Sequence, residues 1–324
     1  MNAPIAIAGG GAFGTALAIA LAKQGRPVHL WARDAALVHT LQTRRESPRL
    51  IGAHLPENVS VSADFGATAT CSTVLLAVPM QALRAFLGKQ GNHLDGKALI
   101  ACCKGVDLST LRGPTALIEQ VCPDARAMIL TGPSFAADIA NGLSTALTLA
   151  CRDDLASAEV QNILSGPVLR IYRNTDVIGA ELGGALKNVI AIAAGIVIGA
   201  GLGESARAAL ITRGFSEMVR FSTRSGARQN TLMGLSGFGD LVLTCTSDQS
   251  RNFRHGLALG RGEMPDATQT VEGVATAQAV LQQAIKLDLG DHIPVTSMVA
   301  KVTSSQITVP DAIHALMSRP LKEE

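Results

Sequence analysis

Residues 5–14, which read IAIAGGGAFG, place four apolar residues directly before the pattern Gly-x-Gly-x-x-Gly. The apolar run predicts a buried strand, and the pattern of residues 15–23 predicts a helix after it. In such a unit Gly9 permits a tight turn, Gly11 lets a pyrophosphate approach the backbone, and Gly14 lets helix and strand pack closely. Phosphates would meet free N–H groups at the positive end of the helix. We therefore predict a dinucleotide site at this turn.

Further short apolar runs follow in the first half of the chain, separated by helical patterns. These runs are Val28–Trp31, Val74–Val78, Ala98–Ala101 and Met128–Leu130. Continuous apolar strands that alternate with helices are typical of a parallel sheet covered on both faces. We expect an α/β fold with a Rossmann-type, doubly wound parallel sheet over residues 1–175.

The second half of the chain has a different periodicity. After Asn174 apolar residues recur at helical spacing, as at Leu182, Leu186 and Val189, and again near residues 278–285 and 312–317. No internal repeat or low-complexity linker separates the halves. We place the domain boundary near residue 175 and predict a second, mainly α-helical domain over residues 176–324.

The composition indicates a folded protein without a strongly charged partner. Of the 324 residues, 47% are hydrophobic and 17% charged, and the formal net charge is only +2. This balance argues against disorder, nucleic-acid binding and an anionic membrane partner. Residues 3–22 lack the basic start of a signal peptide, and the apolar stretch 189–203 is too short to cross a bilayer. We expect a cytoplasmic protein that does not insert into membranes, with residues 189–203 in a buried helix.

The six cysteines form no C-x-x-C pair and have no histidine at metal-ligand spacing. We predict reduced thiols that act as small hydrophobic residues, as expected in a reducing compartment, and no metal site. The cysteines are Cys71, Cys102, Cys103, Cys122, Cys151 and Cys245.

Arg33 follows the second predicted strand, where an acidic residue would bind the ribose 2′-hydroxyl of NAD. An arginine suits the 2′-phosphate of NADP, so NADP(H) is favoured over NAD(H). The adjacent Asp34 leaves use of both open, and a solvated surface arginine is the alternative. Pro79, Lys104 and residues 132–136 follow later strands, whose carboxyl ends border the ligand crevice of an open parallel sheet. Each of them could also be an ordinary turn.

Lys187 lies in an apolar helical pattern, where a buried charge is costly and needs a partner or a purpose. A lysine that snorkels to the surface is the alternative. Asp240 and Thr244 would share one face of a helix, although Asp240 could equally cap a helix after Gly239. Arg251 and its neighbour Asn252 offer a guanidinium fork and neutral donors, which suit a phosphate dianion.

Long motifs extend from about residue 5 to residue 295. They are GGGAFGTALA at 9–18, LWAR at 30–33, LAVP at 76–79, KG at 104–105, GPSFA at 132–136, NTDVIGAELGGALKNVIAIAAG at 174–195, AALITRG at 208–214, GFGDLVLTCTS at 237–247, SRN at 250–252 and VEGV at 271–274. With these motifs the chain resembles the bacterial-type NAD(P)-dependent glycerol-3-phosphate dehydrogenases. It departs at Phe13, where tryptophan is common, at Cys102 and Cys103 before Lys104, and at Thr270.

The resemblance implies an enzyme that reduces dihydroxyacetone phosphate to sn-glycerol 3-phosphate with NADPH or NADH, for glycerophospholipid synthesis, as a homodimer. Lys187 would be the general acid, because a lysine with a pKa of about 10.4 is protonated near neutrality. Lys104 would stabilise charge on the substrate oxygens, and Asp240 would orient Lys187 or a substrate hydroxyl.

The resemblance also implies two sets of ligand contacts. Substrate contacts would be Lys104, Gly132, Ser134, Lys187, Asp240, Thr244, Ser250, Arg251 and Asn252. Cofactor contacts would be Gly9, Gly11, Ala12, Phe13, Gly14, Arg33, Pro79, Lys104, Ala136, Arg251, Thr270 and Glu272. A β-hydroxyacid dehydrogenase or ketopantoate reductase, which selects a carboxylate, is the nearest alternative. A non-catalytic NAD(P)-binding sensor is the alternative from another class.

Overall fold

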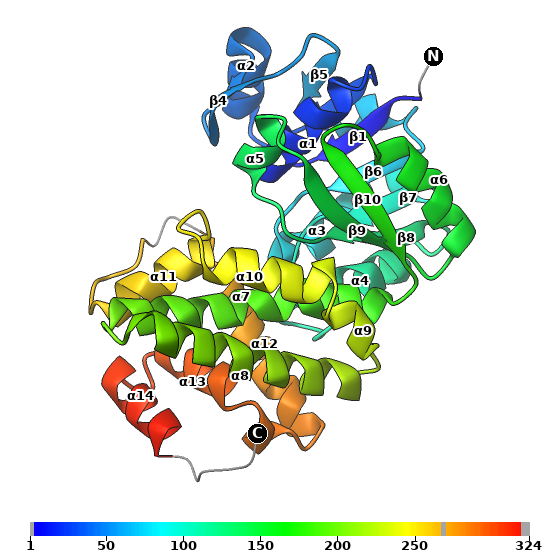
Figure 1. The fold of residues 1–324 in the computed structure, drawn as a ribbon. Coiled ribbons are helices and arrows are strands. Elements are labelled where there is room, and N and C mark those ends of the chain that lie inside the picture. Colours follow the sequence, from blue (N-terminus) through cyan, green and yellow to red (C-terminus); the bar gives the residue numbers. More distant parts are fainter. Residues whose placement is uncertain (1–2, 267–269, 319–324) are drawn as a thin grey trace. The chain divides into compact units, whose positions relative to one another are not determined.

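The computed structural model describes residues 3–266 and 270–318 (Figure 1). Two compact units divide the chain, and each is described by itself. The first comprises Met1–Lys104 and Arg112–Glu181, and the second comprises Gly105–Leu111 and Leu182–Glu324. The short segment Gly105–Leu111 thus belongs to the second unit, and the predicted boundary near residue 175 remains a prediction.

The first unit is built on a large sheet. Among the described residues it has eight strands in the order β10-β9-β8-β7-β6-β1-β2-β5. These strands are β1 (Ile5–Ala8), β2 (Val28–Trp31), β5 (Val59–Ser62), β6 (Thr73–Leu76), β7 (Ala98–Ala101), β8 (Arg126–Thr131), β9 (Thr145–Ala150) and β10 (Leu169–Asn174). A separate antiparallel pair consists of β3 (Glu46–Ser47) and β4 (Leu50–His54).

The doubly wound α/β sheet predicted from the apolar runs is confirmed, with one change at its end. Strands β5, β2, β1, β6, β7 and β8 pair in parallel. Strand β9 pairs antiparallel with β8, and β10 continues parallel to β9, so these two strands run the opposite way. The apolar runs do not predict β5, β9 or β10.

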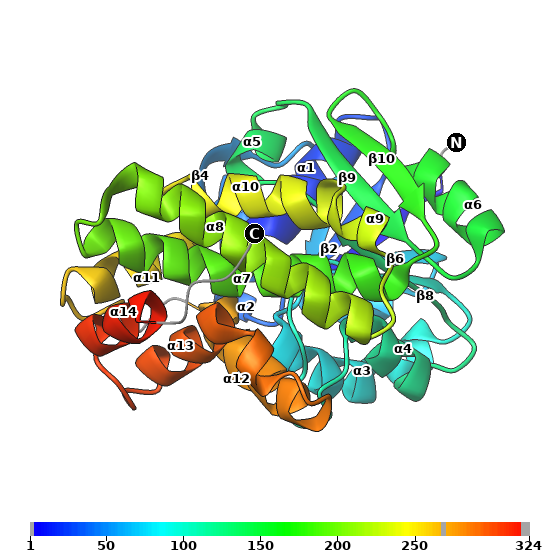
Figure 2. The ribbon, with the colours of Figure 1, turned by 60° about the horizontal axis from the view of Figure 1, so that its bottom comes forward.

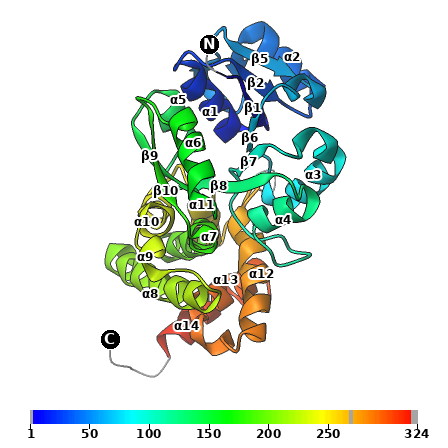
Figure 3. The same cartoon turned by 90° about the vertical axis from the view of Figure 1, so that its right-hand side faces the viewer.

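Helices cover both faces of this sheet. Successive residues of a strand point to opposite faces, so each strand contributes to the packing on both sides. On β1, Ile5 and Ile7 pack with α1, α2, α5 and α6, while Ala6 and Ala8 pack with α3 and α4. Figure 3 shows α1, α5 and α6 on one side of the strands and α3 and α4 on the other. The helices are α1 (Ala12–Ala22), α2 (Ala35–Arg44), α3 (Met80–Leu94), α4 (Pro114–Val121), α5 (Ala136–Ala140) and α6 (Asp154–Leu164), with a 3₁₀ turn η1 (Phe65–Thr68).

The second unit is helical, as predicted, and is arranged around α7 (Val177–Gly199) (Figure 2). One side of α7 packs with α8, α10, α11 and α12, and another packs with α12, α13 and α14. The other elements are α8 (Gly203–Arg224), α9 (Gln229–Leu232), the π-helical turn η2 (Leu235–Gly239), α10 (Asp240–Cys245), α11 (Arg251–Gly260), α12 (Glu272–Lys286), η3 (Gly290–His292), α13 (Pro294–Thr303) and α14 (Val309–Met317).

Helix α7 is also the one helix among the described residues that is long and apolar enough to cross a membrane. Its most apolar stretch is 83% buried inside the structure, however, so α7 serves here as a core helix. The buried helix predicted at residues 189–203 is confirmed as the C-terminal half of α7, although that helix already ends at Gly199.

Candidate active site

In the turn after β1, Gly9, Gly11 and Gly14 have the geometry expected from their positions in the Gly-x-Gly-x-x-Gly pattern. Gly9 has a φ of +130°, and a Cβ there would lie 2.5 Å from the carbonyl oxygen of Ala77. A Cβ on Gly14 would lie 2.0 Å from the Gly9 oxygen, whereas one on Gly11 would meet no atom within 4 Å. Gly11 is the N-cap of α1, so the helix begins at Ala12, earlier than the predicted Thr15. Open space at a helix N-terminus fits a pyrophosphate.

Alanine substitutions at two of these glycines are expected to have different effects. Gly14→Ala should destabilise the protein by roughly 1–3 kcal/mol, because the new Cβ forces the turn open. Gly11→Ala should leave the melting temperature nearly unchanged but weaken NADPH binding about tenfold or more, because its Cβ fills space meant for phosphate. Thermal unfolding and NADPH fluorescence titration measure both effects. Wild-type NADPH affinity in Gly11→Ala would place the pyrophosphate elsewhere.

Arg33 and Asp34 follow β2, and the structure gives them different surroundings. The Asp34 carboxylate caps α2, accepting hydrogen bonds from the backbone N–H of Ala36 at 2.9 Å and of Leu37 at 3.4 Å. Arg33 is exposed. Asp34 therefore serves as a helix cap directly after the exposed Arg33.

Lys104, Gly132 and Ser134 lie together after β7 and β8, which are neighbouring strands. The Lys104 ammonium donates to the Gly132 carbonyl oxygen at 3.2 Å, and the Ser134 hydroxyl donates to the same oxygen at 3.1 Å. Gly132 has a φ of +135°, which favours glycine. Pro79 caps the start of α3 and is exposed, and Ala136 is the first residue of α5.

Of the two cysteines beside Lys104, Cys102 is not placed for reactivity. All six cysteines of the chain are free and buried, as predicted. Burial raises the pKa of the Cys102 thiol to about 12, although the positive charge of Lys104 opposes the shift. A thiol with so high a pKa is a poor nucleophile.

Among residues 3–266 and 270–318, no group of three or more His, Cys, Asp or Glu side chains is placed to hold a metal ion.

In the second unit Lys187 is buried and hydrogen-bonded to the pair predicted to accompany it. Its Nζ lies 2.6 Å from Asp240 Oδ1 and 2.6 Å from Thr244 Oγ1. The residues are 6%, 1% and 3% exposed, respectively. The alternative of a lysine that snorkels to the surface is therefore wrong. A buried ammonium held by a carboxylate and a hydroxyl has a fixed direction, as a proton donor needs.

Asp240 and Thr244 share one face of α10, as their spacing predicts. Gly239 is the N-cap of α10, so Asp240 does not itself cap the helix but is its first residue. The π-helical turn η2 before it needs small residues: a Cβ on Gly237 would lie 2.0 Å from the Leu232 oxygen. A Cβ on Gly183 of α7 would lie 2.6 Å from the Ser236 oxygen. This close approach brings the start of α10 beside the turn of α7 that carries Lys187.

The start of α11 carries Ser250, Arg251 and Asn252, which the structure places in different environments. Ser250 is the N-cap, and its hydroxyl accepts from the Phe253 N–H at 3.1 Å. Arg251 is exposed, whereas Asn252 is buried and donates from Nδ2 to Asn188 Oδ1 at 3.0 Å. An exposed guanidinium at a helix N-terminus suits phosphate recognition. The amide of Asn252, in contrast, is engaged inside the protein.

Glycines let α11 approach α7 closely. A Cβ on Gly256 would lie 2.0 Å from the Ile192 oxygen, and one on Gly260 would lie 2.4 Å from the Ile196 oxygen. From the other side, a Cβ on Gly195 would lie 2.1 Å from the Phe253 oxygen. The backbones of the two helices are therefore in contact, which fixes the start of α11 relative to α7.

At the next helix, α12, Thr270 is exposed and Glu272 is half-buried as the first helical residue.

Two carboxylates that are not among the predicted site residues accept hydrogen bonds from other helices: Glu217 is buried and Glu181 is half-buried. Glu217 of α8 accepts from the backbone N–H of Val295 at 2.7 Å and of Thr296 at 3.1 Å, so it caps α13 from another helix. Glu181 of α7 accepts from the Thr115 N–H at 2.8 Å and from its hydroxyl at 2.7 Å. Burial raises the pKa of each carboxyl to about 7, although these hydrogen bonds oppose the shift.

The raised pKa of Glu217 predicts a loss of stability as pH rises. In the unfolded chain this carboxyl ionises near pH 4.5, and in the folded chain near 7. Between these values the folded state binds more protons, so its free energy of unfolding falls with rising pH. Glu217→Gln should therefore show a shallower fall than the wild type between pH 5 and 8, as measured by urea unfolding. Parallel curves for the two proteins would contradict the shifted pKa.

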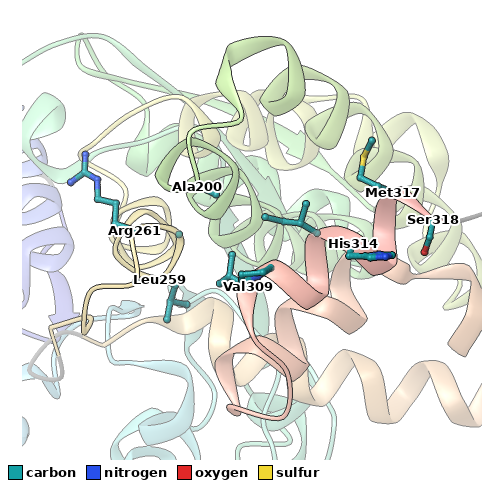
Figure 4. Close-up of a pocket in the computed structure, with 11 residues that line it drawn as sticks. Ala200, Leu259, Arg261, Val309, His314, Met317 and Ser318 are labelled. Atoms are coloured by element: carbon teal, nitrogen blue, oxygen red, sulfur yellow. The ribbon is translucent and has the colours of Figure 1, made fainter.

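A cavity of about 870 Å³ lies elsewhere in the second unit. Figure 4 shows Leu259 and Arg261 on one side of it and Val309, His314 and Met317 on the other. None of the described residues that line it belongs to the predicted substrate or cofactor contacts. The cavity is therefore separate from the Lys187 cluster.

Comparisons with known proteins agree over nearly the whole chain. The family model described as NAD-dependent glycerol-3-phosphate dehydrogenase N-terminus matches residues 4–157, and the model for its C-terminus matches residues 176–314. A glycerol-3-phosphate dehydrogenase [NAD(P)+] of Cereibacter sphaeroides is 58% identical over 320 residues, covering 99% of this chain and 100% of that protein. The corresponding protein of Paracoccus denitrificans is 56% identical, with 99% of each chain covered.

A solved structure extends the agreement to three dimensions. The crystal structure of glycerol-3-phosphate dehydrogenase from Coxiella burnetii matches with a TM-score of 0.93 and 36% identity, covering 98% of this chain and 99% of the other. Both halves of the chain, and both of its folded units, therefore have the same relatives. The chain belongs to the NAD-dependent glycerol-3-phosphate dehydrogenase family.

Proposed function

We propose that this protein is a glycerol-3-phosphate dehydrogenase that reversibly reduces dihydroxyacetone phosphate to sn-glycerol 3-phosphate with NADPH or NADH. The observation that carries the proposal is the buried Lys187, held at 2.6 Å by both Asp240 and Thr244. Reduction of a ketone to an alcohol adds a hydride to the carbon and a proton to the oxygen, and a positioned acid can supply that proton. A fixed ammonium in a protein interior is suited to deliver that proton.

Each residue then has a role in this reaction. Lys187 donates the proton, and Asp240 and Thr244 hold its ammonium in one direction. Lys104 stabilises the negative charge that develops on the substrate oxygens, because such charge is strongest in the transition state. The exposed Arg251 binds the phosphate of the substrate. Ser250, Gly132 and Ser134 complete the substrate contacts, whereas the amide of Asn252, also predicted as a contact, is bonded to Asn188 and Gly273 inside the protein.

The first unit provides the cofactor site in this proposal. The bound dinucleotide supplies the hydride. Gly9, Gly11 and Gly14 receive the pyrophosphate at the start of α1, where the open space beside Gly11 fits it. The remaining predicted cofactor contacts are Ala12, Phe13, Arg33, Pro79, Lys104, Ala136, Arg251, Thr270 and Glu272.

NADP(H) is the favoured cofactor, with NAD(H) also accepted. The exposed Arg33 supports this preference, since Asp34 already caps α2. We further propose that residues 1–175 bind the dinucleotide and residues 176–324 carry the catalytic lysine. The protein would act in the cytoplasm as a homodimer, without membrane insertion, and its product would supply glycerophospholipid synthesis.

Steady-state kinetics test the proposal directly. The oxidation of NADPH and of NADH is followed by absorbance, with dihydroxyacetone phosphate or a 2-keto acid as the second substrate. We expect turnover with dihydroxyacetone phosphate and a higher kcat/KM with NADPH. Turnover with only the 2-keto acid would indicate a β-hydroxyacid dehydrogenase or ketopantoate reductase. Cofactor binding without turnover of either substrate would indicate a sensor.

A further inference from the structure

A chain of buried amides links three helices of the second unit. Asn188 of α7 is 3% exposed, and its Oδ1 accepts from Asn252 Nδ2 of α11 at 3.0 Å. Asn252 Oδ1 in turn accepts from the backbone N–H of Gly273 in α12 at 2.9 Å. The donor at Gly273 can only meet an oxygen, so the amide orientations of Asn252 and then of Asn188 are both determined.

At Gly273 this contact leaves no space for a side chain. A Cβ on Gly273 would lie 2.7 Å from the Asn188 backbone oxygen and 2.8 Å from Asn252 Oδ1. The start of α12 therefore rests directly on α7 and on the Asn252 amide. Because these groups are buried, an amide left without its partner would be unfavourable, which favours one arrangement of the three helices.

Each residue of this chain directly follows a residue of the predicted site. Asn188 follows Lys187, Asn252 follows Arg251, and Gly273 follows Glu272. Consecutive Cα atoms are about 3.8 Å apart, so fixing one residue of a helix fixes the backbone of its neighbour. The three amide groups thus join the segments that carry the proton donor, the phosphate ligand and a cofactor contact.

We propose that Asn188 is a positioning residue that acts through Asn252, whose amide is also held by the Gly273 N–H, to hold Arg251 in place relative to Lys187. The inference rests on the proposed function, in which Arg251 binds the substrate phosphate. Catalysis depends on such placement, since a displacement of 1 Å can cost about 100-fold in rate. Asn188 itself transfers no proton in this scheme.

The test compares two substrates that differ only in the phosphate. Asn188→Leu removes the acceptor for Asn252 at similar side-chain volume. We expect kcat/KM for dihydroxyacetone phosphate to fall roughly 10- to 100-fold, and that for unphosphorylated dihydroxyacetone to fall less than about threefold. Asn188→Asp keeps an acceptor oxygen toward Asn252 and should restore most of the lost activity. If Asn188→Leu does not fold, Asn188→Ala is measured in the same way.

A double-variant comparison separates positioning from a general structural role. When Arg251 is already alanine, the Asn188 substitution should have little further effect on dihydroxyacetone phosphate. Glu217→Gln is the matched control, because it alters a buried polar contact of the same unit outside the site and should leave the ratio of the two substrates unchanged.

Two results would overturn the inference: an equal loss for both substrates in the Asn188 variants, or a full effect of Asn188→Leu in the Arg251→Ala background. If the proposed function is wrong instead, the wild type itself shows no turnover of dihydroxyacetone phosphate, so the two failures are distinguishable.

Discussion

Replacing Lys187 by alanine is expected to lower kcat for dihydroxyacetone phosphate reduction by about 10²- to 10⁴-fold, the usual contribution of a positioned proton donor. In the structure this ammonium is held by Asp240 and Thr244 inside the helical unit. Without it, the alkoxide formed by hydride transfer has no adjacent acid. NADPH binding should persist, because the glycine turn after β1 is unchanged. Steady-state kinetics and NADPH fluorescence titration measure the two quantities.

A second substitution separates chemistry from stability. Removing Lys187 leaves the carboxylate of Asp240, only 1% exposed, without its cation, and breaking such a pair costs about 3–5 kcal/mol. Lys187→Arg keeps a positive charge beside Asp240, but a guanidinium does not give up its proton near neutrality. We expect Lys187→Arg to be more stable than Lys187→Ala and similarly inactive. Wild-type turnover in either variant would remove Lys187 from the acid role.

Replacing Arg251 by alanine is expected to lower kcat/KM for dihydroxyacetone phosphate by about 10- to more than 100-fold. This range follows from hydrogen bonds to a charged group, which contribute about 1.5–3 kcal/mol each. Arg251 is exposed at the first position of α11, so its loss should cost little stability. Dihydroxyacetone, which lacks the phosphate, should be reduced almost equally well by the variant and the wild type. Kinetics with both substrates give the comparison.

The matched control for this prediction is Arg254, an exposed arginine one turn further along α11. It donates to the backbone oxygen of Asp248, which places it in a local structural contact. Arg254→Ala should leave kcat/KM for both substrates near the wild-type value. Equal losses in Arg251→Ala and Arg254→Ala would indicate a nonspecific charge effect, and no loss in Arg251→Ala would place the phosphate elsewhere.

Most of the strands that the sequence predicts are buried on both faces and almost wholly apolar. IAIA in β1 and ALIA in β7 are such runs. The two edge strands escape this criterion because their residues alternate, as VSVS does in β5 and LRIYRN in β10. Reversal of direction at β9 has no local signal either, since pairing depends on the neighbouring strand β8.

Within the site, features that depend on local spacing are predicted well from the sequence, whereas contacts between residues distant in the sequence are not. The glycine turn and the shared face of Asp240 and Thr244 follow from spacing alone. The contact between Lys187 and Asp240 joins residues far apart in the sequence, so only the resemblance suggests it. The cap at Asp34 has a local signal, an aspartate just before a helical segment. Glu217, Glu181 and Asn188 have no local signal, because their partners come from other helices.

The backbone contact between α7 and α11 has a consequence for engineering this protein. Replacing glycine with alanine inside a helix ordinarily gains up to about 1 kcal/mol, so propensity-based thermostabilisation would include Gly195, Gly256 and Gly260 among its targets. At each of them a methyl group would overlap a carbonyl of the opposite helix. These three glycines should therefore be left unchanged when the protein is stabilised, although helix propensity alone would recommend alanine.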